Sequence, residues 1–229
     1  MSGDPLRASL AEQLSRLRDG PLPEALLDIC SESIAAAGHE LTLIRPRDWS
    51  ELRHVEGGAG RGVPYWATLW PSGRALAEAL AGRALGGVRV LELGCGLGAP
   101  SVVAAHRGAE VLATDGTAEA VVFTAHNLAL NDLEGEVAQL DWTDPGALAG
   151  SGRWDLVVAS DILYRRQNVE ALTRVLPALL GPGGEAVIAD PRRAGGRDFM
   201  AAARGMFSVV TTDSPHHDNV ALHRLRPLR

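Results

Sequence analysis

Three glycines at alternate positions, Gly94, Gly96 and Gly98, follow a short apolar segment at 88–93 and precede a run of small residues at 100–107. This pattern is typical of a β-strand, a tight turn and the start of a helix. Glycine lets the backbone approach a ligand closely, and the free N–H groups of a helix N-terminus favour anionic or carboxylate groups. The turn therefore predicts a site for a nucleotide-like cofactor.

Two classes of cofactor fit this turn. Residues 94–99 read G-x-G-x-x-A, which satisfies the dinucleotide-binding fingerprint. Residues 92–98 read E-x-G-x-G-x-G, with Glu92 at the first position, which resembles motif I of the class I methyltransferases that use S-adenosylmethionine. The turn alone leaves the choice between the two cofactors open.

Acidic and aromatic side chains follow the next two expected strands. Asp115 comes directly after the strand expected at 110–114, where an acid accepts ribose hydroxyls in either cofactor class. Its alternative role is to cap a helix that begins near Thr117. Asp141 and Trp142 end the strand expected at 135–140, and adenine offers an amino edge to the acid and a face to the ring.

A third group of polar residues follows the apolar strand expected at 154–159. Its continuous apolar character is expected of a strand covered by helices on both faces, and it places Ser160, Asp161 and Tyr164 at the same edge of the sheet. The functional interpretation is that these side chains contact a ligand, because ligands bind at this edge of open α/β sheets. The structural alternative is that Asp161 caps a helix near Gln167 and that Tyr164 packs against the core.

An aromatic segment, 64–74 (PYWATLWPSGR), lies before the glycine turn. Tyr65, Trp66 and Trp70 either fasten the N-terminal part of the chain to the core or form a flat apolar wall beside the cofactor. The two roles are compatible.

Composition narrows the functional classes. The chain has 229 residues, 46% of them apolar, which is enough for one globular domain with its own core. It has no apolar stretch long enough to span a membrane and no signal-peptide pattern, so we expect a cytoplasmic protein without membrane contact. A net charge of −6 argues against a nucleic-acid partner. Two cysteines, Cys30 and Cys95, and a His216-His217 loop give no metal-site spacing.

The remaining pattern predicts an N-terminal appendage at 1–62 and one main domain at 63–229. In the appendage we expect helices at 4–20 and 23–37, a short extended segment at 40–45 and a flexible glycine linker at 57–62. The appendage has too little apolar surface for its own core and would serve as a lid or wall. In the main domain, helices are expected at 72–84, 121–130 and 167–180, a glycine turn at 181–184, and strands at 185–189, 207–212 and 220–225, the last two antiparallel.

Several motifs in the same order resemble methyltransferase family 16, whose members have seven strands and mostly methylate protein lysines. The resemblance covers about residues 60–229 and is greatest to the electron transfer flavoprotein β-subunit lysine methyltransferases, which share the motifs seen here at 64–73 and 190–193. It implies a Rossmann-like α/β fold with a mostly parallel sheet in the strand order 3-2-1-4-5-7-6 and helices on both faces. It also implies that seven residues contact the methyl donor: Trp70, Gly94, Cys95, Gly96, Asp115, Trp142 and Ser160. By the same resemblance Asp161 and Tyr164 line the acceptor site.

We therefore expect S-adenosylmethionine as the donor, S-adenosylhomocysteine as the product, and the lysine of a protein as the acceptor. Glu92 and Asp141 complete the expected donor site, and the chemistry requires no metal. One alternative is N- or O-methylation of a small molecule, which would need an enclosed pocket capped by residues 1–62. The other is a non-catalytic protein that only binds the cofactor.

Overall fold

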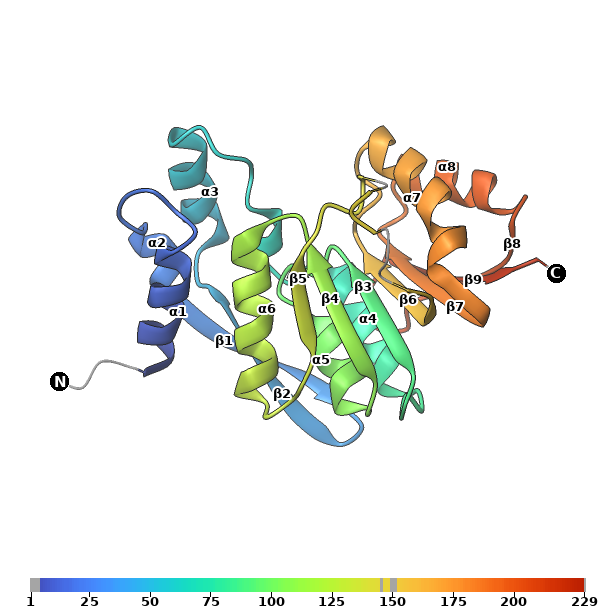
Figure 1. Cartoon of the computed structure of the whole chain (residues 1–229), viewed down its shortest axis with the longest axis horizontal. Coiled ribbons are helices and arrows are strands. Elements are labelled where there is room, and N and C mark those ends of the chain that lie inside the picture. Colours follow the sequence, from blue (N-terminus) through green and yellow to red (C-terminus); the bar gives the residue numbers. More distant parts are fainter. Residues whose placement is uncertain (1–4, 145, 149–151, 229) are drawn as a thin grey trace.

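A seven-stranded sheet forms the middle of the protein (Figure 1). The computed structural model describes residues 5–144, 146–148 and 152–228. The strand order is β5-β4-β3-β6-β7-β9-β8, in which β9 pairs antiparallel with both β7 and β8 and the other pairs are parallel. The strands are β3 (Arg89–Leu93), β4 (Glu110–Asp115), β5 (Glu136–Gln139), β6 (Trp154–Ser160), β7 (Leu180–Asp190), β8 (Phe207–Asp213) and β9 (Ala221–Pro227). Counted along the sheet this is the expected order 3-2-1-4-5-7-6, and the terminal antiparallel pair is confirmed.

Helices cover both faces of the sheet, as the apolar strand at β6 predicts. Leu156 and Val158 of β6 pack into one buried cluster, with side chains of α4, α5 and α6. Val157 and Ala159 alternate with them and pack into a second cluster, with α7 and α8. The helices are α4 (Pro71–Ala81), α5 (Ala99–His106), α6 (Ala118–Leu130), α7 (Arg166–Leu179) and α8 (Ala194–Ala203).

The N-terminal part contains a β-hairpin where a helix is expected. The prediction of a helix at 23–37 is wrong: α2 (Glu24–Leu27) is one turn long, and β1 (Ile29–Ala36) pairs with β2 (His39–Pro46). The last residues of β1 alternate between exposed and buried side chains, which is the strand period. The backbone is left-handed at both Ala37 (φ 51°) and Gly38 (φ 86°), which closes the hairpin in two residues.

The structure contains two helices that the sequence analysis did not predict. The structure has α8 after β7 and α3 at Trp49–Gly58, so the first two residues of the linker expected at 57–62 are helical instead. Asp48 caps α3 by accepting hydrogen bonds from the backbone N–H groups of Ser50 and Glu51. The glycine segment expected as a turn at 181–184 is instead part of β7, where the register with β6 is interrupted between Trp154 and Leu156.

The N-terminal elements pack against α6 and share its core. Side chains from α1 (Pro5–Ser15), α2, β2 and α3 form one cluster with Trp66 and Phe123. Arg18, which is buried, donates hydrogen bonds to Glu56 of α3 and Glu119 of α6, at 2.7 and 2.6 Å. These contacts hold α3 beside α6, and the aromatic 3-10 turn Tyr65–Ala67 follows α3 in the chain.

Candidate functional site

The glycine turn has the conformation that its composition predicts. Gly94, Gly96 and Gly98 all have left-handed backbone, with φ of 69°, 57° and 73°. A Cβ on Gly98 would lie 2.4 Å from the Thr124 side chain, and one on Gly94 would lie 2.9 Å from Ile162. The turn therefore packs too closely against α6 and the loop after β6 for any other residue.

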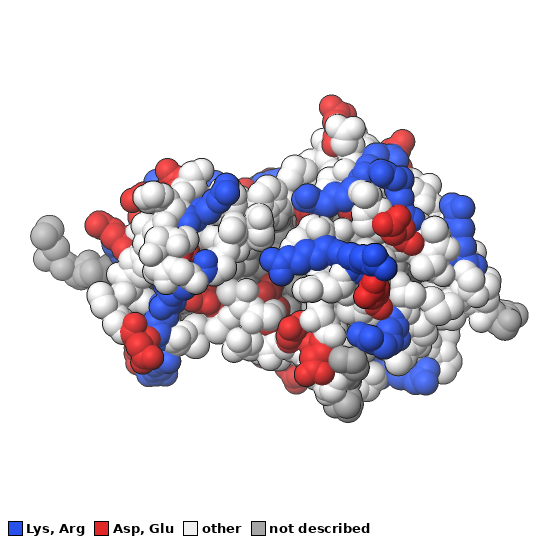
Figure 2. Space-filling model, turned by 90° about the horizontal axis from the view of Figure 1, so that it is seen from above, with Lys and Arg blue, Asp and Glu red and all other residues white. Residues whose placement is uncertain are grey.

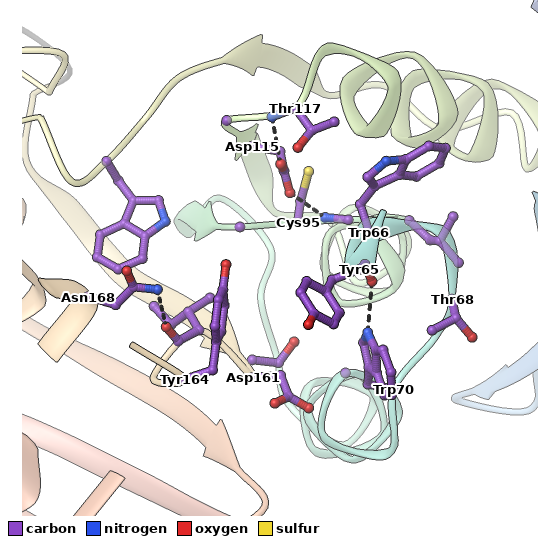
Figure 3. Close-up of a pocket in the computed structure, with 18 of the residues that line it drawn as sticks. Tyr65, Trp66, Thr68, Trp70, Cys95, Asp115, Thr117, Asp161, Tyr164 and Asn168 are labelled. Carbon is purple, nitrogen blue, oxygen red and sulfur yellow. Dashed lines mark hydrogen bonds between the residues drawn. The ribbon is translucent and has the colours of Figure 1, made fainter. Parts of the chain in front are cut away.

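A cavity of about 660 Å³ lies over this turn, at the carboxyl ends of the parallel strands (Figure 3). This volume is within the range of small-molecule and cofactor sites. Ten of the eleven predicted site residues line it: Trp70, Gly94, Cys95, Gly96, Asp115, Asp141, Trp142, Ser160, Asp161 and Tyr164. We call it the central cavity.

Glu92 is the predicted site residue that does not line the central cavity. Its side chain is fully buried beneath the turn, where Oε2 accepts hydrogen bonds from the backbone N–H and the hydroxyl of Ser101. Burial raises the pKa of Glu92 to about 8. Glu92 thus fastens the start of α5 to β3 and supports the turn from below.

Asp115 is hydrogen-bonded both to the glycine turn and to the residue before α6. Its Oδ2 accepts the backbone N–H of Gly96 at 2.9 Å, and Oδ1 accepts that of Thr117 at 2.8 Å. The second bond restrains the residue that precedes α6, while the first ties the carboxylate to the glycine turn. Burial raises the pKa of Asp115. Each oxygen retains acceptor capacity for a hydroxyl from the cavity.

Asp141 and Trp142 follow β5 and lie on the same side of the cavity as Asp115. Trp142 is buried, and a Cβ on Gly94 would be 3.8 Å from its Nε1. Asp141 is exposed, and its Oδ1 accepts the backbone N–H and the hydroxyl of Thr143 at 2.9 and 2.6 Å. The indole is therefore fixed, and the exposed carboxylate is available at the rim.

Asp161 and Tyr164 lie on the opposite side of the cavity from Asp115 and Thr117 (Figure 3). Asp161 does not cap α7, whose N-cap residue is Arg165; it pairs instead with Arg193, at 2.6 Å. Tyr164 is 47% exposed, so it does not pack into the core. Neither residue therefore has the helix-capping or core-packing role of the structural alternative, and both side chains face the cavity.

The aromatic residues before α4 differ in position: one packs into the core and the others line the cavity. Trp66 is buried against Phe123, with ring centroids 5.1 Å apart, and fastens the segment to α6. Trp70 lines the cavity, and its Nε1 donates to the Tyr65 carbonyl at 2.8 Å. Tyr65 is 47% exposed at the cavity mouth.

Several cavity residues were not identified from the sequence. Arg193 follows β7 in a motif, but its pairing with Asp161 depends on the loops after β6 and β7 meeting. Asn168 donates from Nδ2 to the Ile162 carbonyl at 2.7 Å and so fixes that loop. Neither contact could be predicted from the spacing of residues in the sequence. Among the described residues, no group of three or more His, Cys, Asp and Glu side chains has a metal-site arrangement.

Comparisons with known proteins find methyltransferases. Residues 51–205 match a family described as lysine methyltransferase. The electron transfer flavoprotein beta subunit lysine methyltransferase of Danio rerio is 36% identical over 136 residues, or 57% of this chain and 51% of that protein. Protein N-lysine methyltransferase METTL21A of Danio rerio is 34% identical over 142 residues, or 59% of this chain and 63% of that protein. The chain therefore spans between half and two thirds of the length of these relatives.

The solved structures show the fold. A Thermus thermophilus 16S rRNA N2 G1207 methyltransferase (RsmC), in complex with AdoMet and guanosine, superposes with a TM-score of 0.63 at 22% identity. The match covers 91% of this chain and 52% of that one. The sheet and its helices thus have the Rossmann-like arrangement of methyltransferases.

Proposed function

Because this chain belongs to the lysine methyltransferase family, we propose that it transfers a methyl group from S-adenosylmethionine to the side-chain amine of a lysine in a protein substrate. The observation that carries the proposal is the division of the central cavity. The glycine turn and Asp115 lie on one side, and Asp161 and Tyr164 on the other. A donor and an acceptor would thus meet between them.

The donor side fits a nucleoside. Asp115 would accept the ribose hydroxyls, Trp142 would stack on adenine, and Asp141 would accept from its amino edge. The backbone around Cys95 and Gly96, together with Trp70 and Ser160, would hold the rest of the donor. Bound S-adenosylmethionine supplies a methyl group already activated on its sulfonium.

The acceptor side orients an amine. A lysine amine has a pKa of about 10.4 in water and reacts only when neutral, so the site must favour loss of its proton. The aromatic walls formed by Tyr65 and Tyr164 would remove water from the amine, which lowers its pKa. Asp161 and the Tyr164 hydroxyl would orient the nitrogen toward the donor. Alignment of this kind can supply several kcal/mol of the barrier.

We assign residues 1–62 to the wall of this site and 63–229 to the catalytic domain. Support comes from α3, where the Trp49 ring is 5.8 Å from Trp70 and 6.3 Å from Tyr65. We also propose a cytoplasmic location. Both cysteines are free thiols, and no helix in the described part of the chain is long and apolar enough to cross a membrane.

Two measurements test the proposal. Calorimetry should show that the protein binds S-adenosylhomocysteine and does not bind NAD. Binding of NAD without binding of S-adenosylhomocysteine would rule out S-adenosylmethionine as the donor. The purified protein is then incubated with radiolabelled S-adenosylmethionine and a lysate of cells that lack it, and the label is measured in separated protein, RNA and small-molecule fractions. Label in protein supports the proposal. Label confined to RNA or to small molecules would replace it with one of those acceptors, and binding without label would indicate a non-catalytic protein.

A further inference from the structure

A continuous strip of side chains runs from the mouth of the central cavity, where Tyr65, Tyr164 and Arg165 line it, to α3. It consists of Arg53, Trp49, Tyr65, Tyr164 and Arg165, which we call the aromatic strip. Its three rings are in contact, with centroids 6.3 Å apart for Trp49 and Tyr65 and 5.9 Å apart for Tyr65 and Tyr164. An arginine covers each end, 5.5 Å from the terminal ring. The strip joins α3 of the N-terminal part to the residues just before α7.

The two end arginines are exposed and have no carboxylate partner among the described residues. Arg53 and Arg165 each lie over an aromatic ring, whereas the nearby arginines Arg166, Arg192 and Arg193 are all paired with carboxylates. Figure 2 shows basic side chains, all arginine in this chain, around the hollowed middle of the face seen from above. The charge around the cavity is therefore divided: Arg53 and Arg165 lie at the two ends of the strip, and the carboxylates of the cavity lie between them.

We propose that the aromatic strip is the docking surface for a protein segment whose acceptor lysine is flanked by acidic residues. This inference rests on the proposed function. The lysine would pass between Tyr65 and Tyr164 toward Asp161, and acidic side chains on its two sides would reach Arg53 and Arg165. The aromatic faces bury the aliphatic part of the segment, and the end charges set its sequence preference.

An acidic peptide suits the strip better than single-stranded RNA. Arginines interleaved with aromatic rings also bind RNA, by stacking with bases and pairing with phosphates. Here, however, the cavity beneath the strip presents the carboxylates of Asp115, Asp141 and Asp161. Carboxylates attract a lysine ammonium and repel a phosphate.

Binding of synthetic peptides to the full chain, saturated with S-adenosylhomocysteine, tests the proposal by fluorescence anisotropy. Three labelled peptides share one central lysine and carry Glu, Gln or Arg at the flanking positions; an oligouridine is the fourth probe. An exposed ion pair contributes up to about 1 kcal/mol, or about fivefold in affinity. We therefore expect the Glu peptide to bind roughly tenfold more tightly than the Gln peptide, with a preference that weakens in high salt.

Charge reversal separates recognition from folding. The double variant Arg53→Glu/Arg165→Glu should prefer the Arg peptide, an inversion that structural damage cannot produce. Arg174→Glu is the matched control, because Arg174 is exposed on α7, more than two turns beyond Arg165. It should keep the wild-type preference.

Four results would overturn the proposal: equal binding of the Glu and Gln peptides, no binding of any peptide, an equal effect of the control, or tighter arginine-dependent binding of oligouridine. The assay involves no methyl transfer. Loss of the acidic preference alongside continued lysine labelling would therefore reject the docking surface alone.

Discussion

Arg193 donates two hydrogen bonds to one oxygen of Asp161. Its Nε and Nη2 lie 3.0 and 2.6 Å from Oδ1, and in the described part of the chain Oδ2 receives none. The Asp161 backbone is left-handed, with φ of 58°, and its N–H donates to the Ala189 carbonyl at 3.0 Å. Arg193 therefore holds the carboxylate from the next loop and leaves the second oxygen for an acceptor.

Loss of Arg193 should disturb the acceptor side without affecting the donor. We expect Arg193→Ala to lower kcat roughly tenfold to a hundredfold, the size of effect expected from a misplaced reacting group. The donor Kd should be unchanged. Arg192→Ala is the control, because Arg192 is also exposed and pairs with Asp213, away from Asp161. Equal rates for the two variants would show that Arg193 does not position Asp161.

Asp161→Asn and Tyr164→Phe should retain donor binding and lose most methyl transfer. Both side chains would act on the acceptor in the transition state, so kcat should fall while the melting temperature changes little. The measurements are donor affinity by calorimetry, thermal stability and the single-turnover rate on an identified substrate. A large loss of stability with a near-normal rate for the folded fraction would make both residues architectural.

Asp115→Ala should weaken donor binding more than it slows the chemical step. Loss of the bidentate, charge-assisted contact to two ribose hydroxyls should cost roughly 1.5–3 kcal/mol of binding free energy. The variant also loses the bonds from Gly96 and Thr117, so its melting temperature is measured alongside the Kd. Unchanged donor affinity would leave Asp115 with only its role before α6.

Glu185, far from the cavity, should make the stability of the fold depend on pH. Burial favours a raised pKa for Glu185, but hydrogen bonds from Arg224, Arg83 and Arg226 lower it to about 2. The folded-state pKa of Glu185 lies below the ordinary value of about 4.5, so the ionised carboxylate stabilises the folded state. This stabilisation is present above about pH 4.5 and is lost as the pH falls toward 2. Glu185→Gln should cost on the order of 1–3 kcal/mol at pH 7. Urea unfolding at several pH values should show the difference disappearing in acid; a constant difference would contradict it.

The sheet was predictable from the sequence because its signals are local. Continuous apolar strands such as β6 and the glycines at 94–98 permit few alternatives, and the strand order follows from the family resemblance. The N-terminal part was predicted less well. Residues 29–36 alternate only over a short stretch and are bounded by Ala37, which adopts a left-handed turn despite its Cβ. The helix pattern assumed there was therefore wrong.

Part of the site depends on contacts between distant segments. Asp115 and Asp161 follow strands and could be located by position alone. Arg193 and Trp49 reach the site through loop and helix placements that spacing does not encode. The helix α8 was missed because Gly195 and Gly196 suggest a loop, whereas here they allow close packing: a Cβ on each would lie 2.2 Å from the Leu163 carbonyl and 2.4 Å from Asp190 Oδ1.

Identification of the labelled atom tests the central claim most directly. Proteins that acquire label from radiolabelled S-adenosylmethionine are digested and sequenced by tandem mass spectrometry, with Asp161→Asn as the inactive comparison. The account predicts methyl groups on a lysine side-chain nitrogen with the wild-type chain and far fewer with the variant. Methyl groups on another residue type, or on lysine to the same extent with Asp161→Asn, would contradict it.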